Sequence, residues 1–237
     1  MKIITFLSDF GAKDWFVAAV KGEILKINKN AFIVDITHAS VPHDIRSAAF
    51  ILKSVYKNFP TGTVHLAVVD PGVGSERKPI IVKSSGYFFV GPDNGIFSYI
   101  YNEDAQVYAI AVKESTSSTF HARDIFGPVA AKLSTDVDPE HLGTKIRDYT
   151  TFEFPRSRKK GVKIYGEIIY IDHFGNCITN ILNTIDIREL FLSKKRIKVK
   201  KFYGEGCPDE IICVKGSSGY YEIACNKGST CDFLGAT

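Results

Sequence analysis

Three aspartates stand at the ends of the first three predicted strands, where each places a carboxylate that could meet a ligand: Asp9, Asp35 and Asp70. Ligands of open parallel sheets bind beyond the carboxyl ends of the strands. Asp9 could accept two hydrogen bonds from a vicinal diol such as a ribose, although a capping or turn aspartate explains it equally well. We expect Asp35 to be structural.

Asp70 opens a tight turn of sequence DPGVG. Its proline and two glycines restrict the chain and let the backbone approach a ligand closely. Arg77 follows at a spacing that lets it fold back toward Asp70, and His121 precedes a predicted helix. Together these three side chains could hold a water and take its proton, because histidine is the usual base and arginine stabilises hydroxide. A lone histidine before a helix is otherwise most often structural.

Two segments of the last third could contact a ligand. Asp172, Phe174 and Asn176 lie within five residues, and an acid, an aromatic ring and an amide suit an amine, a planar ring and a base edge. A β-turn explains the same residues. Further on, the loop GSSG at 216–219 could offer backbone amides and hydroxyls to a carboxylate.

Several common catalytic motifs are absent from the sequence. It has no GxxxxGK[ST], no GxGxxG after the first strand, no GxSxG and no HExxH. The five cysteines include no CxxC pair, and we expect reduced thiols and no bound metal or other cofactor. Metal-dependent hydrolysis stays open as an alternative, with these candidate ligands: His38, His43, Asp44, Asp70, His121, Asp124, Asp172 and His173.

The composition is that of a soluble globular chain. Of 237 residues, 45% are hydrophobic and 24% are charged. The longest apolar runs reach seven residues, far short of the roughly 20 that span a bilayer. We therefore expect no membrane association. The N-terminal residues lack the long apolar stretch of a secretory signal, which favours a cytoplasmic location.

The hydrophobic pattern predicts two domains, α/β and then all-β. Residues 1–150 alternate strands and helices, which is typical of a mostly parallel sheet covered on both faces, an α/β sandwich. The strands are expected at 2–7, 32–36, 63–69, 79–84, 87–90 and 106–112, and the helices at 14–27, 44–56 and 124–133.

Residues 151–162 break this pattern with a proline, a glycine and a basic run, and we interpret them as a linker. Residues 163–237 then predict a small C-terminal antiparallel β-barrel domain. Its strands are expected at 163–171, 177–181, 196–203, 210–214 and 220–225, with one helix at 185–191.

The formal net charge of +4 is unevenly distributed, with −1 on residues 1–155 and +5 on residues 156–237. The excess comes from basic runs at 156–160 and 194–201. Aromatic residues are not interleaved with these runs as stacking platforms for bases would be. We therefore interpret the runs as a charged linker and a lysine-protected edge strand, and expect no nucleic-acid partner.

Taken together, the motifs resemble one family, the S-adenosyl-L-methionine (SAM) hydroxide adenosyltransferases, or adenosine-forming SAM hydrolases, which are related to the SAM-dependent fluorinase and chlorinase. Each motif is weak alone, but the ordered set covers nearly the whole chain. The matching segments are LSDFG at 7–11, DITH at 35–38, VVDPGVG at 68–74, GPDNG at 91–95, TFHARDIFGPVAA at 119–131, DHFGNCITNI at 172–181 and GSSGYYEIACN at 216–226.

The resemblance implies roles for individual residues. The family's water-activating triad falls on Asp70, Arg77 and His121. The substrate-binding positions fall on Asp9 for the ribose diol, Asp14 and Asp172 for the methionine amine, Phe120 near the ribose C5′, Phe174 and Asn176 for adenine, and Ser217 for the methionine carboxylate. It also implies a homotrimer in which each substrate lies between the N-domain of one subunit and the C-domain of the next.

The reaction implied is hydrolysis of SAM to adenosine and L-methionine by in-line attack of an activated water on C5′. A SAM- or adenosine-binding sensor with little turnover is an alternative. A halogenase is a further one, but the halogenases have a tyrosine where this chain has Asp70 and a halide-contacting serine where it has Ala122. A carboxylate facing the nucleophile would repel halide, which favours water.

Overall fold

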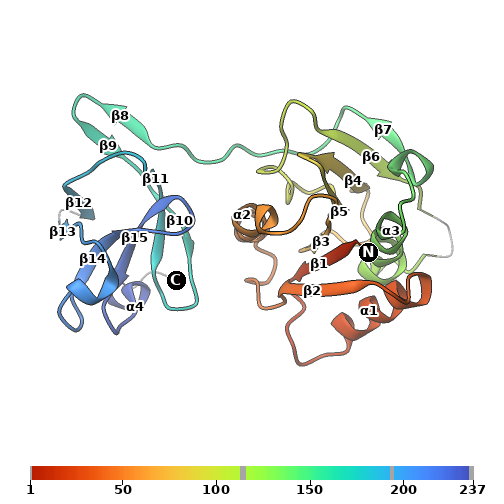
Figure 1. The fold of residues 1–237 in the computed structure, drawn as a ribbon, viewed down its shortest axis with the longest axis horizontal. Helices are drawn as coiled ribbons and strands as arrows, with labels where there is room; N and C mark the ends of the chain where they lie inside the picture. Colours follow the sequence, from red (N-terminus) through yellow and green to blue (C-terminus); the bar gives the residue numbers. More distant parts are fainter. Residues whose placement is uncertain (1, 113–115, 193–194, 235–237) are drawn as a thin grey trace. The chain divides into compact units, whose positions relative to one another are not determined.

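The structure is a computed structural model that describes residues 2–112, 116–192 and 195–234. Its contacts divide the chain into two compact units, Met1–Glu153 and Phe154–Thr237 (Figure 1). Each unit has its own sheet and its own buried core. The residues proposed to do chemistry are distributed over both units.

The first unit is built on a seven-stranded sheet. Its strands are β1 (Ile3–Ser8), β2 (Phe32–Thr37), β3 (Val64–Val68), β4 (Pro79–Ser84), β5 (Tyr87–Pro92), β6 (Gln106–Ile110) and β7 (Gly143–Ile146). They lie in the order β2-β1-β3-β5-β4-β6-β7. The first four of these are mutually parallel, and the other three extend the sheet with antiparallel pairs.

Helices cover both faces of this sheet, as the sequence pattern predicted (Figure 1). They are α1 (Phe16–Ile27), α2 (Ile45–Val55) and α3 (Gly127–Ser134). One core cluster joins Ile24 of α1 and Leu133 of α3 to the sheet, and the other joins Leu52 of α2 to the opposite face. Asp44 caps α2 by accepting a hydrogen bond from the Ser47 backbone amide at 3.0 Å.

Two helix predictions were wrong in their starting points. The first helix begins at Phe16, so Asp14 lies in a bend before it. The last was expected from residue 124, but residues Ala122–Phe126 form a π-helical turn and α3 begins at Gly127. Pro128 explains this, because a proline without an N–H fits the first turn of a new helix.

In the described part of the second unit, all paired strands are antiparallel, and a short helix, α4 (Thr230–Leu234), follows the last of them. The strands of this unit are β8 (Arg158–Lys160), β9 (Lys163–Tyr165), β10 (Ile168–Ile171), β11 (Cys177–Leu182), β12 (Glu189–Leu192), β13 (Lys195–Lys198), β14 (Ile211–Lys215) and β15 (Tyr220–Cys225). They form a four-stranded sheet β10-β11-β15-β14 and two pairs, β12-β13 and β8-β9. Closure of these sheets into a barrel stays a prediction.

Two sequence predictions for this unit were wrong. The helix expected at 185–191 is partly replaced by β12, whose Leu190 packs with Ile197 of β13 in the core. The strand expected at 163–171 is interrupted at Gly166, where a Cβ would lie 2.6 Å from Asn180 Oδ1. Residues 151–162, expected as a linker, include β8, which pairs with β9; the bounds of the domains and of the linker stay a prediction.

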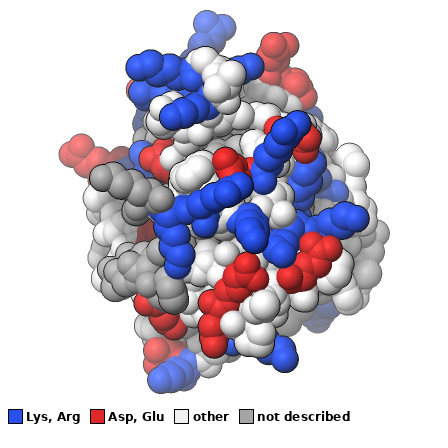
Figure 2. Space-filling view, turned by 90° about the vertical axis from the view of Figure 1, so that its left-hand side faces the viewer, with Lys and Arg blue, Asp and Glu red and all other residues white. Residues whose placement is uncertain are grey.

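The basic runs lie on exposed strands of the second unit. All three residues of β8 are exposed, as are Lys195, Arg196 and Lys198 of β13; Lys194 lies outside the described residues. Figure 2 shows basic side chains gathered on a face of the molecule with acidic ones among them. β13 belongs to a two-stranded sheet, which fits the interpretation of the run at 194–201 as a lysine-protected edge strand. The run at 156–160, expected in a charged linker, includes β8 of the other two-stranded sheet. Across the described residues, none of the helices is both long and apolar enough for a membrane span.

Candidate active site

The first unit brings Asp70, Arg77 and His121 into one hydrogen-bonded cluster. Arg77 Nε donates to Asp70 Oδ1 at 3.0 Å, and Arg77 Nη2 donates to Asp70 Oδ2. The second proton of Nη2 points to His121 Nδ1 at 2.7 Å. The side chains of Arg77 and Asp70 are only 9% and 5% exposed, and His121 is 6% exposed. A buried bidentate pair of this kind fixes both groups in position.

The contact with Arg77 determines the protonation of His121. A guanidinium only donates hydrogen bonds, so Nδ1 of His121 must accept with its lone pair. The imidazole is therefore neutral and carries its proton on Nε2. Burial lowers the pKa of His121, and the charge of Arg77 lowers it further, while Asp70 and Asp124 act in the opposite direction. The structure thus presents a hydrogen-bond donor, Nε2–H, in this site.

The loop between β3 and β4 delivers two members of the cluster. It folds back because Gly74 adopts φ +79°, a conformation that favours glycine. At Gly74 the backbone is so close to the segment before His121 that a Cβ would lie 2.2 Å from the Ser118 carbonyl oxygen. The guanidinium carbon of Arg77 lies 5.3 Å from the centre of the Phe126 ring. The loop and the π-helical turn therefore hold the cluster from two sides.

A cavity of about 510 Å³ in the first unit reaches this cluster. Arg77 and His121 are among its lining residues, with Gly74, Ser118 and part of β6. In the described part of the chain, Nη1 of Arg77 is buried and has no hydrogen-bond partner. The cavity gives a small polar molecule such as water a place beside the cluster.

Asp9 lies just beyond the carboxyl end of β1, as expected. Its Oδ2 accepts a hydrogen bond from the His43 backbone amide at 3.0 Å, and its side chain is 10% exposed. Among the described residues, Oδ1 of Asp9 has no hydrogen-bond partner. Gly11, at φ +71°, donates its amide to the His38 carbonyl at 2.7 Å, which turns the chain away from the strand end. One carboxylate oxygen of Asp9 is thus available to a ligand.

An aromatic cluster stands next to His121. The Phe120 ring, which is 8% exposed, meets Trp15 and Phe16 edge-on, with ring centres 5.5 Å and 5.4 Å apart. Phe10 lies 6.1 Å from Phe120 in a similar arrangement. Asp14 is exposed at the border of this cluster, in the bend that precedes α1. The cluster offers an apolar wall beside the triad.

In the second unit, Asp172 organises its own turn. Its Oδ1 accepts the backbone amides of Phe174 and Asn176, both at 2.9 Å, and its Oδ2 accepts Asn176 Nδ2 at 2.9 Å. Gly175 is at φ +79° and packs against Ser229. This turn leaves the Phe174 side chain exposed, since 73% of its surface is accessible, while Asn176 is buried. The geometry therefore fits both interpretations of this segment, as a β-turn and as a ligand contact.

The loop at 216–219 is the second feature of this unit. Asn183 holds both ends of the loop. Its backbone N–H donates to the Gly219 carbonyl at 3.0 Å, and its side-chain Nδ2 donates to the Gly216 carbonyl at 2.7 Å. Ser217 is exposed. Ser218 Oγ is buried and lacks a hydrogen-bond partner within the described residues.

Sequence reasoning overlooked two residues beside this loop. Glu222 is a lone acid in the strand YYEIAC and is 6% exposed, and Tyr203 donates its hydroxyl to Glu222 Oε2 at 2.7 Å. A charged residue within a run of apolar ones was the available signal, since such a residue is seldom buried without a purpose.

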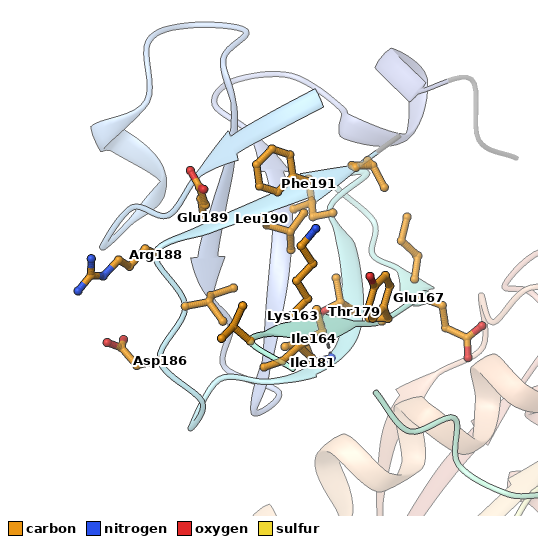
Figure 3. Close-up of a pocket in the computed structure, with 17 residues that line it drawn as sticks. Lys163, Ile164, Glu167, Thr179, Ile181, Asp186, Arg188, Glu189, Leu190 and Phe191 are labelled. Carbon is orange, nitrogen blue, oxygen red and sulfur yellow. Dashed lines mark hydrogen bonds between the residues drawn. The ribbon is translucent and has the colours of Figure 1, made fainter. Parts of the chain in front are cut away.

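A separate cavity of about 660 Å³ lies in the second unit (Figure 3). Its walls combine apolar side chains such as Ile164, Ile181 and Leu190 with a charged rim that includes Lys163 and Glu189. None of the predicted site residues lines it. Within the described residues there is also no group of three or more His, Cys, Asp or Glu side chains arranged to hold a metal ion.

Comparison with known families and structures identifies the relatives of this chain. Residues 4–143 match the model of the SAM hydroxide adenosyltransferase N-terminal domain, and residues 166–237 match that of the C-terminal domain. The chain is 34% identical to the (R)-S-adenosyl-L-methionine hydrolase of Thermus thermophilus, with 99% of this chain and 96% of the relative covered. It is 36% identical to the Methanocaldococcus jannaschii protein of the same name, with 94% and 88% covered.

More distant relatives and a solved structure complete the comparison. The chain is 27% identical to a fluorinase of Nocardia brasiliensis, with 79% of this chain and 73% of the fluorinase covered. A crystal structure of an uncharacterized conserved protein from Thermotoga maritima superposes with a TM-score of 0.89 at 33% identity, covering 99% of this chain and 96% of that one. Two family models in order and near full-length relatives above 30% identity show that the chain belongs to the SAM hydroxide adenosyltransferase family.

Proposed function

We propose that this chain is an enzyme that hydrolyses SAM to adenosine and L-methionine. The observation that carries the proposal is the buried cluster of Asp70, Arg77 and His121 in a chain of this family. Relatives that cover nearly the whole chain carry the name (R)-S-adenosyl-L-methionine hydrolase. We extend their stated epimer to this chain, so that the sulfonium configuration is part of its specificity.

The main task of the protein in this reaction is to position the attacking water. The oxygen of a water forms a bond to ribose C5′, and the C5′–S bond breaks with its electron pair moving to sulfur. Methionine leaves as a neutral thioether, so no metal ion or acid is needed to expel it. The protein has to hold the water in line with the C5′–S bond and to exclude competing solvent.

The triad members divide this task. His121, neutral with a proton on Nε2, donates to the water oxygen, and the Asp70 carboxylate accepts one water proton. One lone pair of the water is then directed at C5′. As the C–O bond forms, the attacking water becomes a strong acid, so a weak base such as an arginine-paired carboxylate suffices to take its proton. Arg77 holds both partners at the required spacing.

The remaining site residues are proposed to bind the substrate in the roles that the family resemblance implies. Asp9 takes the ribose diol, and its unoccupied Oδ1 supports this. Phe120 lies near C5′, and the exposed Phe174 and the buried Asn176 take adenine. Asp14 and Asp172 bind the methionine amine, and Ser217 binds its carboxylate.

We also propose the finer features of the assembly. The two proposed domains, residues 1–150 and 163–237, contribute to each site from different subunits of a homotrimer. The sheets of the second unit close into a barrel in that assembly, and the enzyme works in the cytoplasm. The support for these features is the family resemblance and the division of the binding residues between two compact units.

The experiment is incubation of the EDTA-treated protein with each sulfonium epimer of SAM, with and without chloride or fluoride, followed by chromatography. Adenosine and methionine in equal amounts, from the (R) epimer and without effect of EDTA, are expected. Asp70→Asn should lower turnover about a hundredfold, and the exposed Asp104→Asn should not. A 5′-halo-adenosine would place the chain with the halogenases, and tight binding without products would make it a SAM-binding protein.

A further inference from the structure

Glu222 occupies an unusual position in the second unit. It lies in β15, where its neighbours Tyr221 and Ile223 point into the main core of that unit. Because side chains alternate along a strand, Glu222 lies on the opposite face, which also carries the small apolar cluster of Ile212, Val214 and Ala224. Glu222 as a whole residue is only 6% exposed, and a buried acid beside apolar side chains has to be held by specific contacts.

Two contacts hold it. On one side Tyr203, itself 45% exposed, donates its hydroxyl to Oε2 at 2.7 Å. On the other side the backbone of Gly216 rests on the carboxyl group, so that a Cβ at Gly216 would lie 1.9 Å from Oε1. Among the described residues, Oε1 has no hydrogen-bond partner. The Glu222 carboxyl group therefore packs directly against the start of the loop at Gly216.

The same loop carries the exposed Ser217 and the buried, unpartnered Ser218 Oγ. Asn183 fixes its two ends, but neither of its bonds reaches the two serines between them. The backbone amide of Gly216 donates to the Tyr220 carbonyl at 2.8 Å, and Glu222 is the side chain that packs beneath Gly216. Burial raises the pKa of Glu222 and the nearby Asp172 adds to this, while the bond from Tyr203 opposes it.

We propose that Glu222, held by Tyr203, is a positioning residue that places the Gly216–Gly219 loop for the amino-acid end of the substrate. This inference rests on the proposed function, in which Ser217 contacts the methionine carboxylate. It assigns Glu222 no contact with the reacting atoms. Its effect should therefore appear in the affinity for ligands that contain methionine and not in the chemical step.

The test compares Glu222→Ala, Glu222→Gln and Tyr203→Phe in the full chain. Affinities for L-methionine and for adenosine are measured separately by calorimetry, together with kcat and KM for SAM. We expect Glu222→Ala and Tyr203→Phe to weaken methionine binding and raise KM about tenfold, with kcat and adenosine affinity within about twofold. Glu222→Gln, which can still accept from Tyr203, should restore most of the affinity.

Matched controls are Glu167→Ala and Tyr165→Phe, two exposed positions of the same unit outside the predicted site, which should change nothing. Equal losses for adenosine and methionine would show a general structural role and overturn the inference, as would unchanged methionine affinity in both Tyr203→Phe and Glu222→Ala. A Glu222→Gln variant that binds methionine as weakly as Glu222→Ala would also overturn the inference, because the charge of Glu222, and not its position, would then be what matters. If the wild-type chain does not turn over SAM, the proposed function fails first, and methionine binding alone still tests the loop.

Discussion

At the scale of single residues, Arg77 connects the other two members of the cluster. Its Nη2 uses one proton on Asp70 and the other on His121, and its Nε makes a second bond to Asp70. A lysine offers a single charged point and cannot reproduce this planar fork. The position of the carboxylate relative to the imidazole thus depends on one side chain.

Arg77→Lys should therefore lower kcat about a hundredfold, since small displacements of catalytic groups have effects of that size. KM for SAM should change less than about threefold, because the side-chain contacts that Arg77 makes within the described residues are with Asp70, His121 and Phe126, and none of these is a proposed binding residue. Steady-state kinetics of Arg77→Lys beside the exposed Arg147→Lys would check this. A rise in KM with kcat preserved would instead make Arg77 a substrate-binding residue.

The pKa of His121 predicts how activity depends on acid. Burial and the charge of Arg77 hold this pKa below its ordinary value of 6.5, and the neutral imidazole is the active form. As pH falls, kcat should stay constant through pH 6.5 and decline only below it. A pH profile of kcat measures this directly, and His141→Gln, an exposed histidine of the same unit, should leave the profile unchanged. An acid limb centred above pH 6.5 would contradict the assignment.

At the scale of elements, the turn between β3 and β4 must pack closely on the segment before His121. Gly74→Ala would place a Cβ 2.2 Å from the Ser118 carbonyl, in addition to the strain of a positive φ. Gly62 is a matched control, because it also has a positive φ, +89°, but nothing lies within 4 Å of its Cβ position. Gly62→Ala should cost about 1 kcal/mol of stability and leave activity intact.

Gly74→Ala, in contrast, should lower kcat at least about tenfold, because the loop that carries Asp70 and Arg77 has to move away from His121. Activity and denaturant unfolding of the two variants separate the two effects. If both variants lose only stability, the contact between Gly74 and Ser118 does not matter for the site.

A buried histidine in the inner strand β3 predicts a second pH effect, on the stability of the fold. His65 is fully buried, stacks on Phe89 with ring centres 5.0 Å apart, and shares a 2.7 Å hydrogen bond with Thr5 Oγ1. Burial lowers its pKa from 6.5 to about 3. Between these values the unfolded chain binds a proton that the folded chain does not. Stability from this group is therefore complete above pH 6.5 and falls by about 1.4 kcal/mol per unit below it.

Urea unfolding at several pH values between 8 and 4 measures this slope. His65→Phe, which keeps a ring beside Phe89, should reduce the slope by about one proton's contribution even if the variant is less stable overall. An identical slope in the wild type and the variant would show that other groups cause the acid sensitivity.

Local patterns made some of these elements predictable. The hairpin of β4 and β5 follows from its Ser85-Gly86 turn, whose φ values are +51° and +80°. The strand expected at 220–225 is observed as β15 with the same bounds. The helix expected at 185–191 was wrong because tertiary pairing with β13 overrode a helical pattern. For the site, the sequence motifs identified the three triad residues. They could not show that Nη2 of Arg77 contacts both Asp70 and His121, because that depends on the tertiary fold. The contact between Tyr203 and Glu222 joins residues 19 apart whose meeting depends on the whole sheet.

At the scale of the whole molecule, the residues proposed for one reaction are divided between two compact units. The triad and Asp9 belong to the first, and Phe174, Asn176 and Ser217 belong to the second. A complete site can be assembled from the two units of one chain or from units of two chains. The two arrangements predict different activities when variants with defects in different units are mixed. Activity returns only if the site is built from two chains, because one chain can then supply the intact unit that the other lacks.

Asp70→Asn disables the first unit, and Phe174→Ala with Ser217→Ala disables the second at two exposed positions that the fold does not need. Co-expressed at equal levels with different tags and isolated as mixed forms of the proposed trimer, the two chains should regain about a third of wild-type activity. Each site then draws its first unit from one chain and its second from the next, and in a mixed ring of three about one site in three combines two intact units. Activity no higher than that of the separate variants would show that each chain builds its own site, and sedimentation of the wild type would show whether the assembly is trimeric.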